Sequence, residues 1–189
     1  RNRDGGIPTF CRGWGTLPFD RSCPDITAHV LLALSAWRAQ MPSELRVSID
    51  ETLLRGCEYL RSSQRQDGAW EPLWFGNEQA PGQANPVYGT ARVLDALAVL
   101  PDAGTYAGMV EAGQRFLVGA QNDDGSWGGA ERVAGTLEET SLAVHALSRT
   151  GGAEQVVETG VGWIMAHIDQ VDSPAAIGLY FASLWYHEK

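Results

Sequence analysis

The sequence predicts an all-α fold in which α/α hairpin repeats form part of an (α/α)6 toroid. Three observations support this prediction: apolar and amphipathic helical segments alternate, one helix-turn unit occurs twice, and β-type alternation is nowhere sustained. A chain of 189 residues can bury one sizeable core, and nothing in this length demands two domains. Residues 1–189 are therefore interpreted as a single, partial toroid domain.

The predicted helices are of two kinds that alternate along the chain. Thr27–Trp37 is apolar nearly all round, which is typical of a helix covered on every side. The next segment, from about Leu45 to Arg61, keeps its apolar residues on one stripe and its charged residues on the other face, which indicates an outer helix. The alternation continues with buried helices at Gly89–Leu100 and Leu137–Arg149, amphipathic helices at about Ala107–Ala120 and Gln155–Ile168, and a last apolar, aromatic helix at Ile177–Trp185.

Proline and glycine separate these helices, at Pro42, Pro101 and Gly151-Gly152. The result is four inner and three outer helices, whereas a closed toroid of hairpins uses about six hairpins. The segment 2–6 also looks like the end of a repeat whose helix lies upstream. We therefore expect the chain to be the C-terminal part of a longer protein.

Residues 55–70 and 112–127 are two copies of one unit, in which a helical run closes on Gln and Gly-x-Trp follows four residues later. An amide at a helix end can satisfy backbone groups that the terminus leaves unpaired. The glycine lets the backbone turn back, and the tryptophan offers a broad face to the neighbouring hairpin. We predict a structural clamp rather than a catalytic role for these residues, with Asp67 and Asp124 in the turns. The clamp residues are Gln64, Gly68, Trp70, Gln121, Gly125 and Trp127.

Composition excludes several classes of function. The formal net charge of -9 argues against nucleic acid as a partner, because phosphate binding requires clustered Lys and Arg. Three cysteines without a Cys-x-x-Cys pair suggest neither a disulfide framework nor a zinc ribbon, so a reducing, cytoplasmic location is expected. No apolar run approaches the ~20 residues that span a bilayer, so any membrane contact would be peripheral.

The repeated unit resembles the QW repeat of squalene-hopene cyclases and oxidosqualene cyclases. The segment Asp25–Leu31, read as Asp-Ile-Thr-Ala-His-Val-Leu, is similar to the Asp-Val-Thr-Ala-His-Val-Leu segment of bacterial squalene-hopene cyclases. Tyr88-Gly89-Thr90 is similar to their Tyr-Gly-Thr. These motifs follow the family order, with similar spacing, over nearly the whole chain.

The resemblance implies a class II triterpene cyclase, in which an Asp of an Asp-x-Asp-Asp motif protonates a polyene. The implied substrate is squalene or a related polyprenoid, and the implied chemistry needs no metal and no organic cofactor. The acidic motif does not occur in these 189 residues. In the family it lies one repeat upstream of the segment that matches Asp25–Leu31, so the fragment alone is expected to be inactive.

Asp25 and His29 are the candidate catalytic residues. They are spaced i, i+4, so on a helix they share one face and can interact. By the resemblance, His29 contacts the catalytic carboxyl group, where a cationic imidazole would favour a neighbour that gives up its proton readily. The structural alternative is that Asp25, after Pro24, caps the helix while His29 is a satisfied interior histidine. Both interpretations can hold together.

Four aromatic residues are candidates for substrate binding, because they fall where the family has cavity-lining rings: Phe10, Trp74, Tyr88 and Phe181. A ring face attracts a desolvated cation by about 0.5 to 2 kcal/mol. The hollow of the toroid is therefore expected to be lined by rings and apolar groups rather than by charges. Three departures from the family put the product in doubt: the segment 5–11, an insertion at Glu78–Ala84, and the absence of Gln and Gly-x-Trp after Gly160–Ile164.

Other functions remain open at this point. A diverged, non-catalytic toroid could bind a lipid or a protein partner. Protein prenyltransferase β-subunits share the architecture but hold zinc, and Cys57 falls on an outer helix, so no metal site is expected. Toroid glycosidases need two facing carboxylates, whereas the adjacent Glu138 and Glu139 are predicted to cap a helix. A fragment with exposed inner faces is also expected to self-associate.

Overall fold

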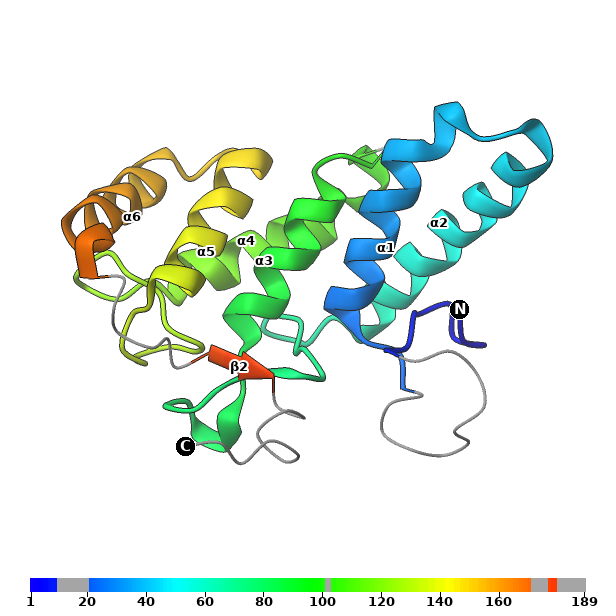
Figure 1. Ribbon diagram of the computed structural model, residues 1–189. Helices are drawn as coiled ribbons and strands as arrows, with labels where there is room; N and C mark the ends of the chain where they lie inside the picture. Colours follow the sequence, from blue (N-terminus) through cyan, green and yellow to red (C-terminus); the bar gives the residue numbers. More distant parts are fainter. Residues whose placement is uncertain (10–20, 101–102, 171–176, 180–189) are drawn as a thin grey trace.

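The computed structural model describes residues 1–9, 21–100, 103–170 and 177–179 (Figure 1). Six α-helices dominate this part of the chain. Their bounds are Pro24–Trp37 (α1), Ser43–Ser63 (α2), Pro86–Leu97 (α3), Ala107–Gly119 (α4), Leu137–Thr150 (α5) and Glu154–His167 (α6). All six helices predicted over residues 27–168 are thus present.

The helices form three hairpins that lie side by side, α1 with α2, α3 with α4, and α5 with α6 (Figure 1). Helix α3 packs between α1 and α5, so these three form an inner row, and the helix that follows each of them lies on the outer side. The main apolar core fills the space between the two rows, with Leu60, Leu94 and Leu117 fully buried. This arrangement confirms the all-α toroid architecture.

The prediction that α1 is covered on every side was wrong for this chain. Only residues near its start and Leu31 are buried, whereas Ala33, Ala36 and Trp37 are exposed. The reason is its position: among the described helices, α1 has one inner neighbour, α3, whereas α3 packs against both α1 and α5. Helix α3 is accordingly the one that is buried along most of its length.

The two clamps make the same contacts. At the end of α2, the Gln64 amide donates to the carbonyls of Gly68 and Met109, both at 2.9 Å. At the end of α4, the Gln121 amide donates in the same way to Gly125 and Val156, both at 3.0 Å. Since Met109 lies in α4 and Val156 in α6, each glutamine joins one outer helix to the next.

The tryptophans complete each clamp. The indole N–H of Trp70 donates to Leu60, and that of Trp127 to Leu117, both at 2.7 Å. Each ring lies over a glycine of the next outer helix, Gly113 or Gly160, where an added Cβ would come within about 3 Å of the ring. The third repeat has this glycine, Gly160, although its sequence lacks the Gln and Gly-x-Trp of the other two repeats.

A further copy of the turn is present at the start of the chain. Gly5 adopts a positive φ and packs on the Arg55 carbonyl, as Gly68 packs on Ala112. The Ile7 N–H donates to the Thr27 hydroxyl at 2.9 Å, as Trp70 and Trp127 donate their own N–H groups to threonine hydroxyls in α3 and α5. Residues 2–7 therefore form the same turn as the two complete repeats.

Replacing Gly68 by Ala is expected to destabilise the fold by more than 1 kcal/mol. Gly68 has φ 91°, and its added Cβ would lie 2.2 Å from the Ala112 carbonyl oxygen, so both the backbone and the packing must change. Chemical denaturation followed by circular dichroism measures the loss. Gly108→Ala in α4 is the control, because nothing lies within 4 Å of its Cβ position, and it is expected to be neutral or stabilising.

The last predicted helix does not begin where the sequence suggested. Ile177–Leu179 forms a strand, β2, which pairs antiparallel with Phe75–Asn77 (β1) and places Gly178 opposite Gly76. Glycine weakens a helix, and this pairing satisfies the backbone instead. Residues 180–185 of the predicted helix lie outside the described residues.

Candidate functional site

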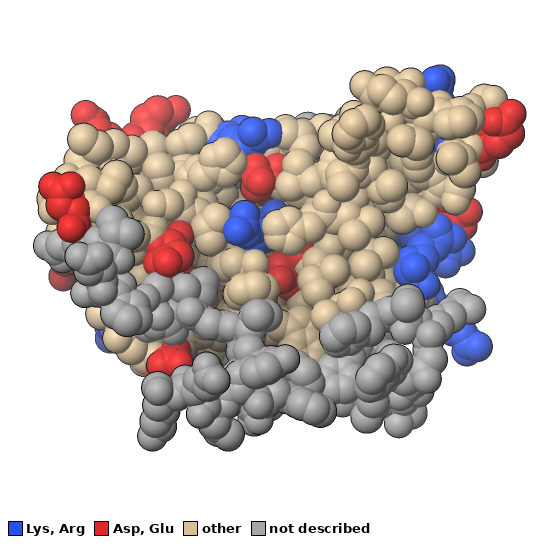
Figure 2. Space-filling view, viewed as in Figure 1, with Lys and Arg blue, Asp and Glu red and all other residues tan. Residues whose placement is uncertain are grey.

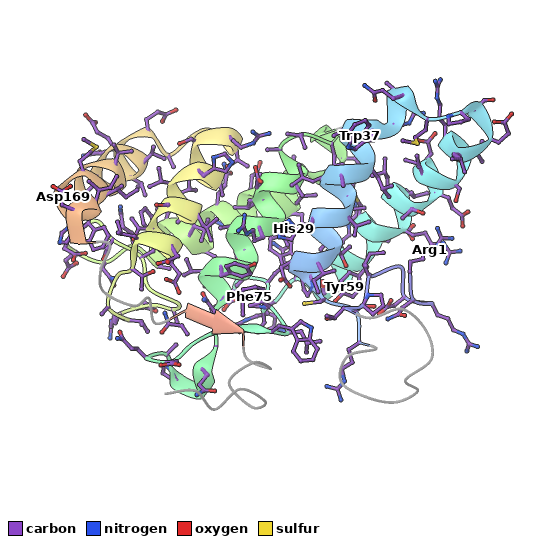
Figure 3. All side chains as sticks on the ribbon, in the orientation of Figure 1. Arg1, His29, Trp37, Tyr59, Phe75 and Asp169 are labelled. Carbon is purple, nitrogen blue, oxygen red and sulfur yellow. The ribbon has the colours of Figure 1, made fainter. Side chains whose placement is uncertain are left out.

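The candidate site lies at the N-terminal ends of the inner helices α1 and α3. Asp25 is in the first turn of α1, and Tyr88 is in the first turn of α3. The segment that leads into β1 contacts the starts of both helices. The Leu73 N–H donates a hydrogen bond to the Cys23 thiol at 3.2 Å, and the Phe75 ring stacks on the Tyr88 ring. Figure 3 labels His29 and Phe75 at this place.

Asp25 is buried, with 1% of its surface exposed. Its carboxylate accepts a hydrogen bond from the Cys23 thiol at 2.6 Å. Burial, together with the Asp25 charge, raises the pKa of Cys23 well above its ordinary value. The prediction that Asp25 caps α1 was wrong, because Cys23 occupies the N-cap position and no side chain bonds to the free N–H groups there.

His29 is exposed on the inner side of α1, so the interpretation as an interior histidine was also wrong. Among the described residues, Asp25 and His29 form no ion pair within 4 Å. Partial desolvation and the nearby charge of Arg92 lower the pKa of His29, while Asp25 and Asp95 act in the opposite direction. The two candidate catalytic residues therefore share a region without a direct bond.

The two candidate rings within the described residues are both buried. Trp74 packs with Cys23, Ile26, Leu73 and Phe75 in a small cluster separate from the main core. Tyr88 is 5% exposed and stacks on Phe75, with 4.8 Å between ring centroids. Burial and the Asp25 charge raise the pKa of Tyr88.

The other two candidate substrate-binding residues, Phe10 and Phe181, lie outside the described residues.

The inner face carries charged residues that the sequence analysis missed. The Asp95 carboxylate in α3 binds His145 at 3.1 Å and Arg149 at 3.0 Å, both from α5. Arg92 lies with its guanidinium 5.3 Å from the centroid of the Tyr88 ring. Figure 2 shows charges gathered across the middle of this face. The expectation of an uncharged lining was therefore wrong for this part of the toroid.

A signal for these charges was present in the sequence. Tyr88, Arg92 and Asp95 are spaced i, i+4, i+7, so they share one helical face. His145 and Arg149 are spaced i, i+4 in the next inner helix. The segments that form α3 and α5 are mostly apolar, so the polar stripe along one face of each helix was not recognised.

A second missed feature is the buried carboxylate of Glu139 at the start of α5. It is fully buried and accepts hydrogen bonds from the amides of Asn77 at 2.9 Å and Asn85 at 3.0 Å. Thr136, not a glutamate, caps the helix, and its hydroxyl also contacts Glu139. Burial raises the pKa of Glu139. Glu138 and Glu139 both lie in the first turn of α5, where acidic side chains favour the helix N-terminus, but the side chain at the N-cap itself is Thr136.

This carboxylate supports the aromatic part of the site. Asn77 belongs to β1, two residues after Phe75, and Asn85 caps α3 by accepting from the Tyr88 N–H at 3.0 Å. Glu139 thus holds the two segments that carry the stacked rings of Phe75 and Tyr88.

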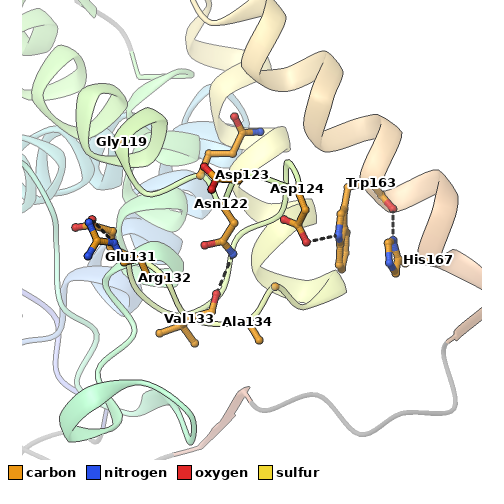
Figure 4. A pocket seen from close by; sticks show the side chains of 12 residues that line it. Gly119, Asn122, Asp123, Asp124, Glu131, Arg132, Val133, Ala134, Trp163 and His167 are labelled. Carbon is orange, nitrogen blue, oxygen red and sulfur yellow. Dashed lines mark hydrogen bonds and ion pairs between the residues drawn. The ribbon is translucent and has the colours of Figure 1, made fainter.

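An open pocket of about 850 Å³ lies elsewhere, between the loop after α4 and the end of α6 (Figure 4). Trp163 donates its indole N–H to Asp124 at 3.2 Å and stacks on His167. None of the candidate catalytic residues lines it. Within the described ranges, no helix has the length and apolar character to cross a bilayer, and no three His, Cys, Asp or Glu side chains cluster to hold a metal.

Comparison with known proteins identifies the family of this chain. Residues 14–173 match the model of the squalene-hopene cyclase C-terminal domain. The chain belongs to the squalene-hopene cyclase C-terminal domain family. This segment contains the clamps, the Asp25–Leu31 motif and the inner-face charges.

The chain is similar to curated synthases that are named for different products. The chain is 31% identical to lanosterol synthase of Homo sapiens over 145 residues, 68% of this chain and 19% of that protein. It is 33% identical to copalyl diphosphate synthase of Streptomyces cyslabdanicus over 131 residues, 68% of this chain and 22% of that protein. It is 31% identical to drimenyl diphosphate synthase of Streptantibioticus cattleyicolor over 156 residues, 80% of this chain and 25% of that protein.

A solved structure shows the same architecture. The ent-copalyl diphosphate synthase from Streptomyces platensis superposes with a TM-score of 0.74 and 26% sequence identity. The match covers 94% of this chain and 32% of the synthase chain. The chain thus spans only about a fifth to a third of the length of these relatives.

Proposed function

We propose that this chain is the C-terminal part of a cyclase that starts the cyclisation of squalene or a related polyprenoid by protonation. The main observation behind the proposal is that three candidate residues lie together at the N-terminal ends of the inner helices α1 and α3. Asp25, His29 and Tyr88, the residues that match the family motifs, lie together beside the Trp74 cluster. Relatives that make lanosterol, copalyl diphosphate and drimenyl diphosphate support a polyprenoid substrate.

In this proposal the chain provides one wall of the reaction cavity, while a carboxyl group of the neighbouring upstream repeat provides the proton. The Phe75–Tyr88 ring pair and Trp74 would exclude water and present π-electrons to the carbocation. No metal or organic cofactor is needed for these steps. The 189 residues alone would be inactive, because they lack the proton donor.

The test is to express the complete polypeptide that contains this segment and to incubate it with squalene, farnesyl diphosphate and geranylgeranyl diphosphate separately. Polycyclic products, identified by mass spectrometry after dephosphorylation where needed, are the expected result. A complete polypeptide whose upstream repeat lacks the Asp-x-Asp-Asp motif and forms no product from any of the three would contradict the proposal.

A second candidate function is a non-catalytic toroid that binds a lipid. The charges of the inner face favour it, because Arg92 already contacts the Tyr88 ring that a carbocation would need. The observation that would support it is a lipid that co-purifies with the complete polypeptide and is recovered unchanged after prolonged incubation.

A further inference from the structure

A short segment, residues 71–77, lies against the start of α3 and carries two of the rings of the candidate site. It is held near both ends by side chains of other elements. The Leu73 N–H donates to the thiol of Cys23, which immediately precedes α1, at 3.2 Å. The Asn77 amide donates to Glu139, in the first turn of α5, at 2.9 Å. The segment therefore links the starts of all three inner helices.

The two stacked rings, Phe75 and Tyr88, differ in how much of their surface is open. Tyr88 is only 5% exposed, because Phe75 stacks on it and the Arg92 guanidinium lies 5.3 Å from its ring centroid. Little of the Tyr88 ring is left for a substrate, and the neighbouring guanidinium charge repels a carbocation. Phe75, in contrast, is only half-buried. Of the pair, Phe75 therefore presents the open ring surface.

Glu139 fixes the segment at its Asn77 end. Both side chains are fully buried, and one Glu139 oxygen, Oε1, accepts hydrogen bonds from the amides of Asn77 and Asn85. The backbone of Gly129 packs closely on Asn77, since an added Cβ at Gly129 would lie 2.3 Å from the Asn77 Cβ. Phe75 and Asn77 are residues i and i+2 of the strand β1, so their side chains leave the strand on the same side. A change at Glu139 therefore reaches the Phe75 ring through two residues of one strand.

We propose that Phe75 is the ring that contacts the polyprenoid at the start of α3, and that Glu139 is the positioning residue that sets where this ring lies. This inference rests on the proposed function. A ring face stabilises a carbocation that forms beside it. With that support the cation persists until the next C–C bond forms. Without it, the cation loses a proton to water and leaves an alkene, or adds water and releases a proton to leave an alcohol. Glu139 thus controls the ratio of products without touching the substrate.

The ratio of products with fewer rings to the fully cyclised product tests the inference, because this ratio does not depend on the amount of folded enzyme. It is measured on the complete polypeptide with squalene, farnesyl diphosphate and geranylgeranyl diphosphate separately. Phe75→Leu is expected to raise the ratio about 2- to 30-fold, which corresponds to a ring contribution of roughly 0.5 to 2 kcal/mol. Glu139→Ala is expected to change it in the same direction. Phe75→Tyr keeps a ring and Glu139→Gln keeps an oxygen for the two amides, so both should restore most of the wild-type ratio. An unchanged ratio in Phe75→Leu or in Glu139→Ala would overturn the inference.

Two control variants separate positioning from general loosening of the fold. Glu138→Ala changes the exposed neighbour of Glu139, and Leu117→Ala opens a cavity in the main core, away from residues 71–77. Both are expected to keep the wild-type product ratio. A shift in Leu117→Ala as large as that in Glu139→Ala would overturn the role of Glu139. Asn77→Ala breaks the same link from its other partner and replaces Glu139→Ala in the test where that variant does not fold.

The ring contact itself is tested without substrate, by fluorine nuclear magnetic resonance of the complete polypeptide with fluorotyrosine in place of tyrosine. The Tyr88 signal is identified by its loss in Tyr88→Phe. Phe75→Leu is expected to shift this signal, because it removes the ring current of the stacked phenyl ring, and Glu139→Ala to shift it in the same direction. An unmoved Tyr88 signal in folded Glu139→Ala would overturn the positioning role. A wild type that converts no polyprenoid would instead remove the proposed function, and the inference with it. The fluorine signal would still show whether Glu139 holds the rings, so the two failures are distinguishable.

Discussion

Replacing Trp127 by Ala is expected to lower the free energy of unfolding by about 3 to 5 kcal/mol. The Trp127 ring is fully buried between α4 and α6, and its indole N–H holds the Leu117 carbonyl at the end of α4. The substitution therefore opens a large cavity and removes a buried hydrogen bond. Urea denaturation followed by circular dichroism at 222 nm measures the difference without relying on tryptophan fluorescence.

Trp37→Ala is the matched control for this prediction. Trp37 ends α1 and is 62% exposed, so its truncation removes the same side chain from a site where little is packed. Its effect is expected to stay within about 0.5 kcal/mol. Equal losses for the two tryptophans would contradict the view that the clamp, rather than the number of tryptophans, holds the hairpins together.

Replacing Glu139 by Ala is expected to cost about 2 to 5 kcal/mol, because the amides of Asn77 and Asn85 would be left buried without an acceptor. Its neighbour Glu138 is exposed, so Glu138→Ala is expected to change the unfolding free energy by less than 0.5 kcal/mol. Glu139→Gln keeps an oxygen for the two amides and should recover most of the loss. Thermal and urea unfolding measure the unfolding free energies of the three variants. A loss in Glu138→Ala as large as that in Glu139→Ala would refute the buried network.

The same residue predicts a pH dependence. Burial raises the pKa of Glu139 above its value in the unfolded chain, so the folded state binds the proton more tightly. The contribution of Glu139 to the unfolding free energy therefore increases as pH falls from neutrality through the folded-state pKa. The difference in unfolding free energy between the wild type and Glu139→Gln, measured at a series of pH values, isolates this contribution. A difference that is constant between pH 4 and 7 would show that the Glu139 pKa is not raised.

The sequence predicted the helical framework well because the framework is local and repeated. Periodicity locates six helices, and two copies of one unit reveal the clamp residues, whose partners lie at matching positions in the next hairpin. Helix α3 nevertheless begins at Pro86 rather than Gly89, since the Asn85 side chain caps it. Such a boundary depends on one hydrogen bond that periodicity does not report.

The candidate site was harder to predict because its contacts are between distant segments. Asn77 and Glu139 are 62 residues apart. The sequence around neither residue indicates that the two side chains join in a buried hydrogen-bond network. Asp25 suggested a helix cap, yet the structure pairs it with the Cys23 thiol because the β1 loop covers both. The strand at Ile177–Leu179 likewise depends on a partner about a hundred residues earlier, so local sequence could not indicate it.

In the part of the chain that the structure describes, the two clamps join α1/α2 to α3/α4 and α3/α4 to α5/α6, which gives this array a nearest-neighbour cooperativity. The hairpin α3/α4 is joined on both sides, and it should be the last part to open under native conditions. Amide hydrogen exchange is then expected to be slowest in α3 and to quicken toward α1 and α6. Local opening in such an array would begin at its flanks and advance inward, one hairpin at a time.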